Sequence, residues 1–157
     1  MTGGGGNPKG VPLLDYAGTR ALSALEKRAQ TPEAGFGRLC RVIGIEVPDD
    51  DVTALSSSQL PEDWHAQPAP DSTRPAGQAW AASLSSLCLM VPSVIIPSES
   101  HALINPLQPQ LSRALPVRTY DFRCDSRRAL YVVFSCWGTA RDPALVGVVA
   151  MMVPHRP

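Results

Sequence analysis

A proline-interrupted apolar stretch, residues 87–106, constrains the fold more than any other part of the sequence. Its first piece, residues 87–91 (LCLMV), has the length and composition of a buried strand rather than a helix. Pro92 has no N–H to donate to a ladder, so we expect a bulge or a sheet edge there. Apolar character resumes at residues 94–96 (VII). Ser93 thus falls at a break between two pieces expected to be buried, which suits either a turn serine or a hydroxyl presented to a cleft.

Composition and charge limit the class of protein. A chain of 157 residues with 44% apolar and 18% charged residues is expected to be one globular domain with a real core. Its 14 basic residues are balanced by 14 acidic ones, which gives no electrostatic argument for nucleic acid or an anionic membrane as a partner. The 16 prolines favour a loop-rich α+β fold over a helical bundle.

Cysteine spacing and the N-terminal sequence predict where in the cell the protein is found, and they give no sign of a metal site. The four cysteines include no CxxC pair and the three histidines add no zinc-ligand spacing, so we predict free thiols and no metal site. The N-terminus has no basic segment followed by an apolar one, and no apolar run reaches the roughly 18 residues of a membrane helix. These features predict a cytoplasmic protein without membrane association.

Hydrophobic periodicity predicts the other elements. Residues 19–29 form the strongest predicted helix, with Thr19 as its N-cap and Glu26 at the margin of its apolar face, either solvated or placed for catalysis. A short helix is expected over residues 77–86, and strands over residues 39–47 and 116–122. Two further apolar runs, residues 129–134 and 144–153, are typical of a β-hairpin.

Several of these segments occur in the order of a known family. They are NPKGVP at residues 7–12, the helix that carries Glu26, LP…W at 60–64, G…W at 77–80, VPS at 91–93 and LINP at 103–106. Together they resemble the RES domain, a family of bacterial toxins. The resemblance covers residues 3–127 and predicts a RES-like domain over residues 1–128, followed by an atypical tail over residues 129–157.

The resemblance implies a fold, a substrate and a partner. The fold is a compact α+β one, with a mixed sheet and short helices, related to ADP-ribosyltransferases. NAD would be the substrate rather than a resident cofactor, and its nicotinamide glycosidic bond would be cleaved by hydrolysis or phosphorolysis. A cognate helix-turn-helix antitoxin of the Xre type is expected to neutralise such a protein.

Site residues follow from the matched motifs. Glu26 matches the family's glutamate and would stabilise the oxocarbenium-like ribosyl centre. Ser93 matches its serine and would hydrogen-bond the ribose or the nicotinamide carboxamide. Asn7, Lys9 and Tyr16 are predicted to contact NAD as well. Asn105 belongs to the matching INP segment, either as a further contact or as the residue that fixes the turn there.

Departures from the family pattern leave other readings open. Gly5 stands where the family has an arginine suited to clamping phosphate, and by the same resemblance we expect a strand and helix that normally precede this segment to be missing. Asp15 aligns with a tyrosine, with Tyr16 expected on the opposite face of its strand. His101 stands where asparagine is usual, and Gln108 where histidine is usual. A truncated, impaired protein that retains at most antitoxin binding, and transfer of ADP-ribose to a protein, are therefore the alternatives.

Overall fold

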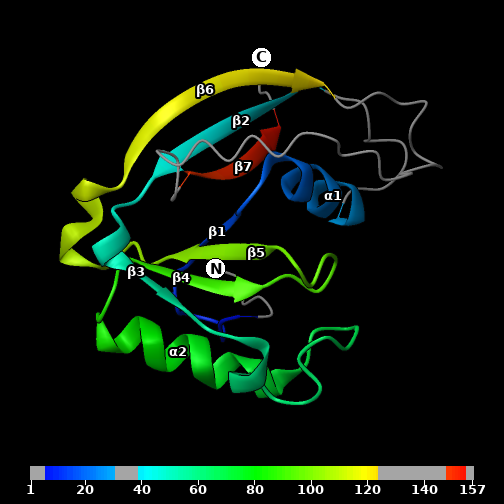
Figure 1. The fold of residues 1–157 in the computed structure, drawn as a ribbon, viewed down its shortest axis with the longest axis vertical. Helices are drawn as coiled ribbons and strands as arrows, with labels where there is room; N and C mark the ends of the chain where they lie inside the picture. Colours follow the sequence, from blue (N-terminus) through cyan, green and yellow to red (C-terminus); the bar gives the residue numbers. More distant parts are fainter. Residues whose placement is uncertain (1–5, 31–38, 124–147, 155–157) are drawn as a thin grey trace.

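The computed structural model describes residues 6–30, 39–123 and 148–154. Within these residues, seven strands form one mixed sheet in the order β3-β4-β5-β1-β7-β2-β6, in which β3 and β4 pair in parallel and the other neighbours are antiparallel (Figure 1). The strands are β1 Leu14–Ala17, β2 Leu39–Glu46, β3 Val52–Ala54, β4 Cys88–Pro92, β5 Ser100–Ile104, β6 Leu115–Arg123 and β7 Val148–Pro154. The α+β class with a mixed sheet and short helices is thereby confirmed.

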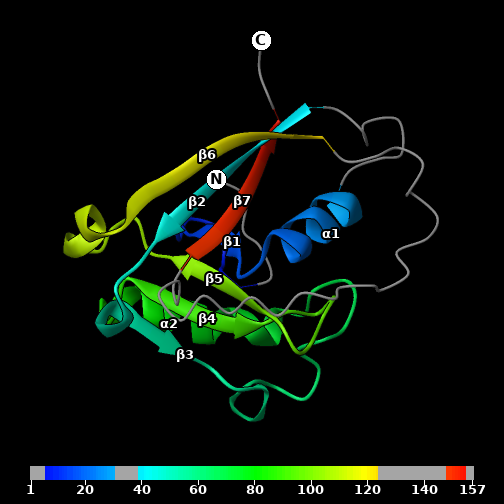
Figure 2. The ribbon, with the colours of Figure 1, turned by 45° about the horizontal axis from the view of Figure 1, so that its top comes forward.

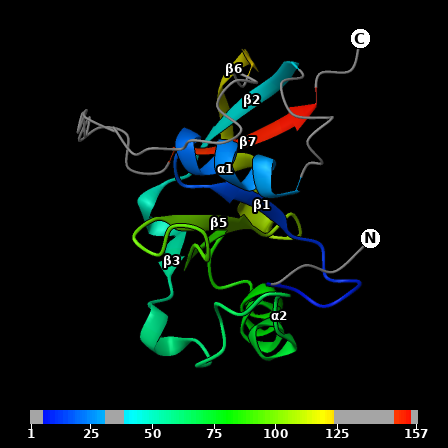
Figure 3. The same cartoon turned by 90° about the vertical axis from the view of Figure 1, so that its right-hand side faces the viewer.

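The two α-helices in the described part of the chain lie at different parts of this sheet. Helix α1, Arg20–Gln30, contacts β1 and β7, whereas α2, Arg74–Ser83, lies beside the β3–β4–β5 part (Figures 1 and 3). Four short 3-10 helices occupy the connections of the described chain: η2 Asp49–Asp51, η3 Ser57–Gln59, η4 Asp71–Thr73 and η5 Pro109–Arg113. None of the helices described is long and apolar enough to cross a bilayer.

The start of α1 is fixed by Thr19, as the sequence predicted. The Thr19 hydroxyl accepts a hydrogen bond from the backbone N–H of Leu22 at 3.1 Å, which satisfies one of the free donors of the first turn. The same hydroxyl donates to Glu99 in the turn between β4 and β5. Gly18 adds a backbone hydrogen bond to Ser100 O at 2.8 Å. These contacts fix the first turn of α1 against the β4–β5 hairpin and so help to place the rest of the helix.

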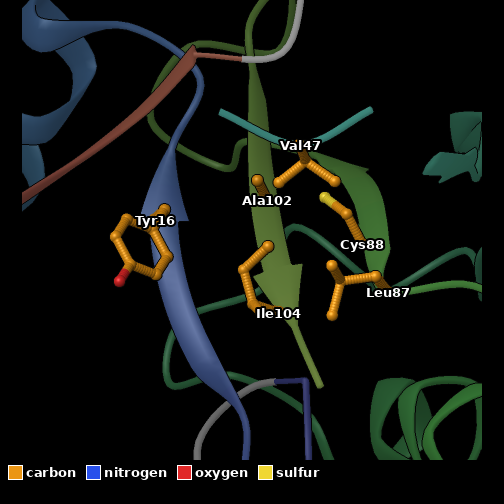
Figure 4. Close-up of a cluster of buried hydrophobic side chains, with 6 residues drawn as sticks. All are labelled: Tyr16, Val47, Leu87, Cys88, Ala102 and Ile104. Atoms are coloured by element: carbon orange, nitrogen blue, oxygen red, sulfur yellow. The ribbon is translucent and has the colours of Figure 1, made fainter. Parts of the chain in front are cut away.

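The two faces of the β4–β5–β1 region carry separate apolar clusters. One cluster combines side chains from β1, β4 and β5 with the residues just after β2 and before β4; its members are Tyr16, Val47, Leu87, Cys88, Ala102 and Ile104 (Figure 4). The other packs α2 on the sheet through Trp80, Ala81, Leu89 and Leu103. Because neighbouring residues of a strand point to opposite faces, Leu103 belongs to one cluster and Ala102 and Ile104 to the other. The face with Leu103 is the one that bears the pocket described below.

One prediction for the 87–106 stretch was right and another was wrong. The first apolar piece forms β4, which ends at Pro92 as expected. Residues 94–96 were expected to be a second buried piece, but they belong to the turn that leads to β5, and Val94 and Ile95 are exposed. A tight connection between two antiparallel strands is imposed by Pro92 and Pro97, and the apolar composition of the segment does not override it.

The C-terminal strand lies inside the sheet rather than at its edge. β7 pairs with β2 from Cys40↔Pro154 to Glu46↔Val148 and with β1 at Ala17↔Ala150 (Figure 2). It covers part of the second apolar run of the predicted hairpin, while the first run, residues 129–134, lies outside the described residues. The predicted boundary at residue 128 stays a prediction, although the end of the predicted tail shares the sheet with β1.

Candidate active site

A pocket of about 460 Å³ opens on the sheet face that carries Leu103. That volume falls in the range of roughly 300–1,000 Å³ typical of small-molecule sites. Its walls come from the N-terminal segment, α1, β1, β4, β5, α2 and the β3–α2 and β4–β5 connections: Gly6, Asp15, Glu26, Ala29, Leu55, Leu60, Trp64, Gln67, Ala69, Pro70, Thr73, Ala76, Gly77, Leu89, Val91, Pro92, Val94, Ile95, His101 and Leu103. Elements far apart in the sequence therefore meet at one hollow.

The ionisable side chains of the described pocket wall form one hydrogen-bonded array. His101 on β5 lies opposite Ala17 of β1, so Asp15, two residues earlier on β1, shares its face of the sheet. His101 Nδ1 lies 3.0 Å from Asp15 Oδ1, and Nε2 lies 2.8 Å from Glu26 Oε1 on α1. The side chains of His101 and Glu26 are 15% and 21% exposed, whereas that of Asp15 is 61% exposed. One imidazole ring thus bridges a helix carboxylate and a strand carboxylate.

The two carboxylates decide the charge of this ring. Burial on its own would lower the pKa of His101, but the hydrogen bonds and charges of Asp15 and Glu26 outweigh it and raise the pKa to about 10. His101 is therefore an imidazolium near pH 7. The array of two carboxylates and one imidazolium carries a net charge of minus one, which suits a cation in the pocket better than an anion.

This bridge predicts a specific pH dependence of stability. The folded-state pKa of His101 lies above the ordinary value of 6.5, so protonation stabilises the folded protein fully below about pH 6.5. The stabilisation is lost as the pH rises through about 10. We expect the free energy of unfolding, measured in urea at several pH values, to fall more steeply over this window in the wild type than in His101→Gln. Parallel curves for the two proteins would contradict the bridge.

The remainder of the pocket wall is mainly apolar. Leu89 and Leu103 form part of its wall, and both also pack against Trp80 of α2. Val94 and Ile95 contribute exposed side chains at the wall, 37% and 39% exposed, and Trp64 adds an aromatic ring. A pocket with apolar walls and a few convergent polar groups is the usual form of a site for a small organic ligand.

Gly77 lets the N-terminal segment lie directly on α2 beside the pocket. A Cβ atom at Gly77 would stand 1.9 Å from the carbonyl oxygen of Gly6, a distance that no side chain can occupy. Gly6 and Gly77 both line the pocket. The glycine at position 77 is therefore required by the close approach of two backbones, which brings the Gly6–Asn7 segment to the rim of the site.

Ser93 is next to the pocket but does not line it. Its side chain is fully buried, and its hydroxyl oxygen accepts hydrogen bonds from the backbone N–H groups of Ile95 at 3.1 Å and Ile96 at 3.3 Å. Its neighbours Pro92, Val94 and Ile95 do line the pocket. The observed contacts are those of a turn serine, so Glu26 lines the hollow while Ser93 holds the turn that shapes its rim. Contact of the Ser93 hydroxyl with a ligand stays a prediction.

Ser93→Ala separates these two roles. Removal of the hydroxyl leaves two backbone donors without their partner, and we expect a loss of about 1–2 kcal/mol in the free energy of unfolding. Measured on folded protein, the affinity for NAD, which is the ligand that the family resemblance implies, should then change less than threefold. A tenfold or larger loss of NAD affinity, with the unfolding free energy unchanged, would instead place the hydroxyl against the ligand.

The other residues predicted to contact NAD lie in different surroundings. Asn7, beside the pocket residue Gly6, donates its side-chain N–H to Val11 O, and Lys9 is exposed. Tyr16 lies on the opposite face of β1 in the apolar core, where burial raises its pKa, as the one-residue offset from Asp15 predicted. Asn105 is buried and joins Ala81 O and Leu107 N, which fixes the turn after β5. Ligand contacts by these four residues stay predictions.

Two residues of the array were not among the predicted site residues. Asp15 and His101 were noted only as departures from the family pattern, one in place of a tyrosine and the other in place of an asparagine. The structure shows that these two departures contact each other. The sequence did show two ionisable residues of opposite charge at positions where the family has other residues. Their contact could be inferred only with the register of β1 against β5.

The fold and the site define a small α+β protein with a ligand pocket in which a helix glutamate and a strand aspartate share a histidine. Among the described residues no group of three or more histidine, cysteine or acidic side chains has the arrangement of a metal site. The sequence profile of the RES domain matches residues 2–125. This chain belongs to the RES domain family, as the resemblance predicted.

Curated relatives agree with this assignment. The chain is 37% identical over 112 residues to a protein of Sphingobium sp. named "Prs ADP-ribosylating toxin", which covers 69% of this chain and 70% of the relative. It is 31% identical over 126 residues to a "Toxin Res" of Yersinia enterocolitica, covering 80% of this chain and 83% of the relative. A "Toxin Res" of Pseudomonas putida is 39% identical over 95 residues, which is 59% of this chain and 61% of the relative. All three of these relatives are named as toxins.

Proposed function

We propose that this chain is a RES-type toxin that binds NAD in the pocket and cleaves its nicotinamide glycosidic bond. Water or phosphate would accept the ribosyl group, and a cognate helix-turn-helix antitoxin of the Xre type would neutralise the protein. The observation that carries the proposal is the placement of Glu26, a carboxylate held at 2.8 Å by His101 on the wall of an otherwise largely apolar pocket.

The reaction requires what such a carboxylate supplies. Breakage of the bond between the ribose C1′ and the nicotinamide nitrogen sends the electron pair to nicotinamide, which leaves as a neutral molecule. Positive charge then develops on C1′ and the ring oxygen, and a preorganised carboxylate beside them stabilises it. The acceptor oxygen bonds to C1′ and releases its proton. Glu26 would also favour the positive charge of the pyridinium ring before the bond breaks.

Transfer of ADP-ribose to a protein is a second candidate. It uses the same bond breakage and differs only in the acceptor that reaches C1′. The Sphingobium relative, 37% identical, is named for ADP-ribosylation. A pocket with Val94 and Ile95 exposed at its wall gives a protein acceptor an apolar surface to approach.

One assay distinguishes these functions. The purified chain is incubated with NAD labelled on the adenine ring, with and without phosphate, and with and without a bacterial extract, while nicotinamide release is followed. Release with free ADP-ribose indicates hydrolysis, and release with ADP-ribose phosphate indicates phosphorolysis. Label that becomes attached to protein only when the extract is present indicates transfer.

Absence of release would overturn the proposed activity. A catalytically impaired chain that retains at most antitoxin binding would then be the better description, because Gly5 stands where the family pattern has a phosphate-clamping arginine. NAD affinity, measured by calorimetry in the same buffer, separates a chain that binds without reaction from one that does not bind.

A further inference from the structure

The contact between α1 and the sheet at the pocket is made through His101. The imidazole lies between Glu26 of the helix and Asp15 of β1, with one carboxylate at each ring nitrogen. Its other strand neighbour is Val91 on β4, which is uncharged. Asp15 and Glu26 are thus the charged groups that face this ring among the described residues, and the ring is mostly buried between them.

The hydrogen-bond pattern fixes the protonation of the ring without reference to any titration. A neutral imidazole has one donor nitrogen and one acceptor nitrogen, and an ionised carboxylate only accepts. Both nitrogens lie within 3.0 Å of a carboxylate oxygen, so both must donate. A doubly protonated, cationic ring is the form that satisfies the two contacts when both carboxylates are ionised.

The His101 cation affects Glu26 in two opposing ways: it fixes the position of the carboxylate, and it offsets the negative charge of that carboxylate. It holds the carboxylate through Oε1, and Oε2 has no hydrogen bond to another described residue, which leaves that oxygen for a ligand. An imidazolium alone would also cancel the negative charge that a ribosyl cation requires. Asp15 offsets this effect, because its carboxylate on Nδ1 returns the array to a net charge of minus one.

We propose that His101 is a positioning residue that holds the Glu26 carboxylate toward the pocket, and that Asp15 acts on Glu26 through the same imidazole ring. The proposal rests on the proposed cleavage of NAD, for which Glu26 is the residue that faces the reacting carbon. Neither partner needs to touch the substrate for this role. Their contribution is to keep a flexible glutamate in one orientation before the charge develops.

The kinetic test is a double-mutant cycle of Asp15→Asn and His101→Gln, read as nicotinamide release from NAD. Misplacement of a catalytic group by about 1 Å can cost about 10²-fold, and we expect His101→Gln to lower kcat by about that factor with KM changed less than threefold. Asp15→Asn should lower kcat in the wild type and have no further effect in His101→Gln. Equal effects of Asp15→Asn in both backgrounds would show that Asp15 does not act through His101.

A spectroscopic titration of the full chain tests the array without any activity. Imidazole nitrogen signals of His101, assigned from their absence in His101→Gln, should keep the doubly protonated form up to about pH 10. The midpoint should shift toward 6.5 in both Glu26→Gln and Asp15→Asn, whereas Asp121→Asn, which alters an exposed carboxylate paired with Arg41, should leave it in place. A midpoint that is near 6.5 in the wild type overturns the proposal.

The two readouts separate failure of this proposal from failure of the proposed function. A wild-type chain that releases no nicotinamide but shows the shifted titration lacks the activity, and the positioning role falls with it while the array stands. Release of nicotinamide that is unaffected by His101→Gln overturns the positioning role alone.

Discussion

Glu26→Gln should lower the rate of nicotinamide release by about 10²- to 10³-fold, the loss typical of removing one preorganised electrostatic contact to a transition state. Glutamine keeps the size of the side chain and a polar atom near His101, but it removes the negative charge that the proposed reaction requires beside the ribosyl centre. KM for NAD should change far less than kcat, because the positive charge that Glu26 would stabilise in the proposed reaction is largest in the transition state. Steady-state measurement of nicotinamide release with both proteins at the same pH gives the comparison.

Glu46→Gln is the matched control for this change. Glu46 is an exposed residue of β2 that does not line the pocket. Glu46→Gln therefore removes one negative charge, as Glu26→Gln does, but leaves the pocket unchanged. The control should retain wild-type kcat and KM within a factor of two. If Glu26→Gln releases nicotinamide as fast as this control, Glu26 has no part in the cleavage, and the pocket must be assigned another role.

Local signals were sufficient for most of the elements. The 3–4 residue spacing of Leu22 and Leu25 after the cap Thr19 predicted α1 to within one residue at each end. The compositions of residues 39–47 and 116–122 predicted β2 and β6, which pair with each other along their length. The error at residues 94–96 has a physical cause: the composition of a short apolar run does not distinguish a buried strand from a turn that is held by Ser93 and bounded by prolines.

Only part of the candidate site could be predicted from the sequence. Glu26 was predicted because its place at the margin of an amphipathic helix and its motif both indicated it, and the structure puts it in the pocket. Asp15 and His101 are 86 positions apart, and no periodicity connects them. Their contact depends on the register Ala17↔His101, which is set by the whole β1–β5 pairing rather than by either segment. Local sequence patterns do not determine this register between distant strands, so they could not predict the contact.

Trp80→Ala should give the largest loss of stability, about 3–5 kcal/mol in the free energy of unfolding. Trp80 is 7% exposed and packs with Leu89 and Leu103 between α2 and the sheet, so its removal leaves a large cavity. Its indole N–H also donates to Ser86 Oγ at 2.8 Å, and that contact is lost. For a chain of this size the melting temperature should fall by about 6–20 °C. Urea unfolding and a thermal melt, both followed by circular dichroism, measure the two quantities.

Two further variants show how much of this loss of stability comes from the packing of Trp80 and how much from its indole hydrogen bond. Trp80→Phe keeps an aromatic ring in the cluster but removes the indole donor, and we expect a smaller loss of about 1–2 kcal/mol. Trp64→Ala deletes the same side chain from a partly buried position on the pocket wall, where the stability should fall by less than half as much as in Trp80→Ala. If the two alanine variants are equally destabilised, the packing of α2 on the sheet is not what Trp80 contributes. Because Leu89 and Leu103 both contact Trp80 and line the pocket, Trp80→Ala should also weaken the proposed binding of NAD at temperatures where the chain remains folded.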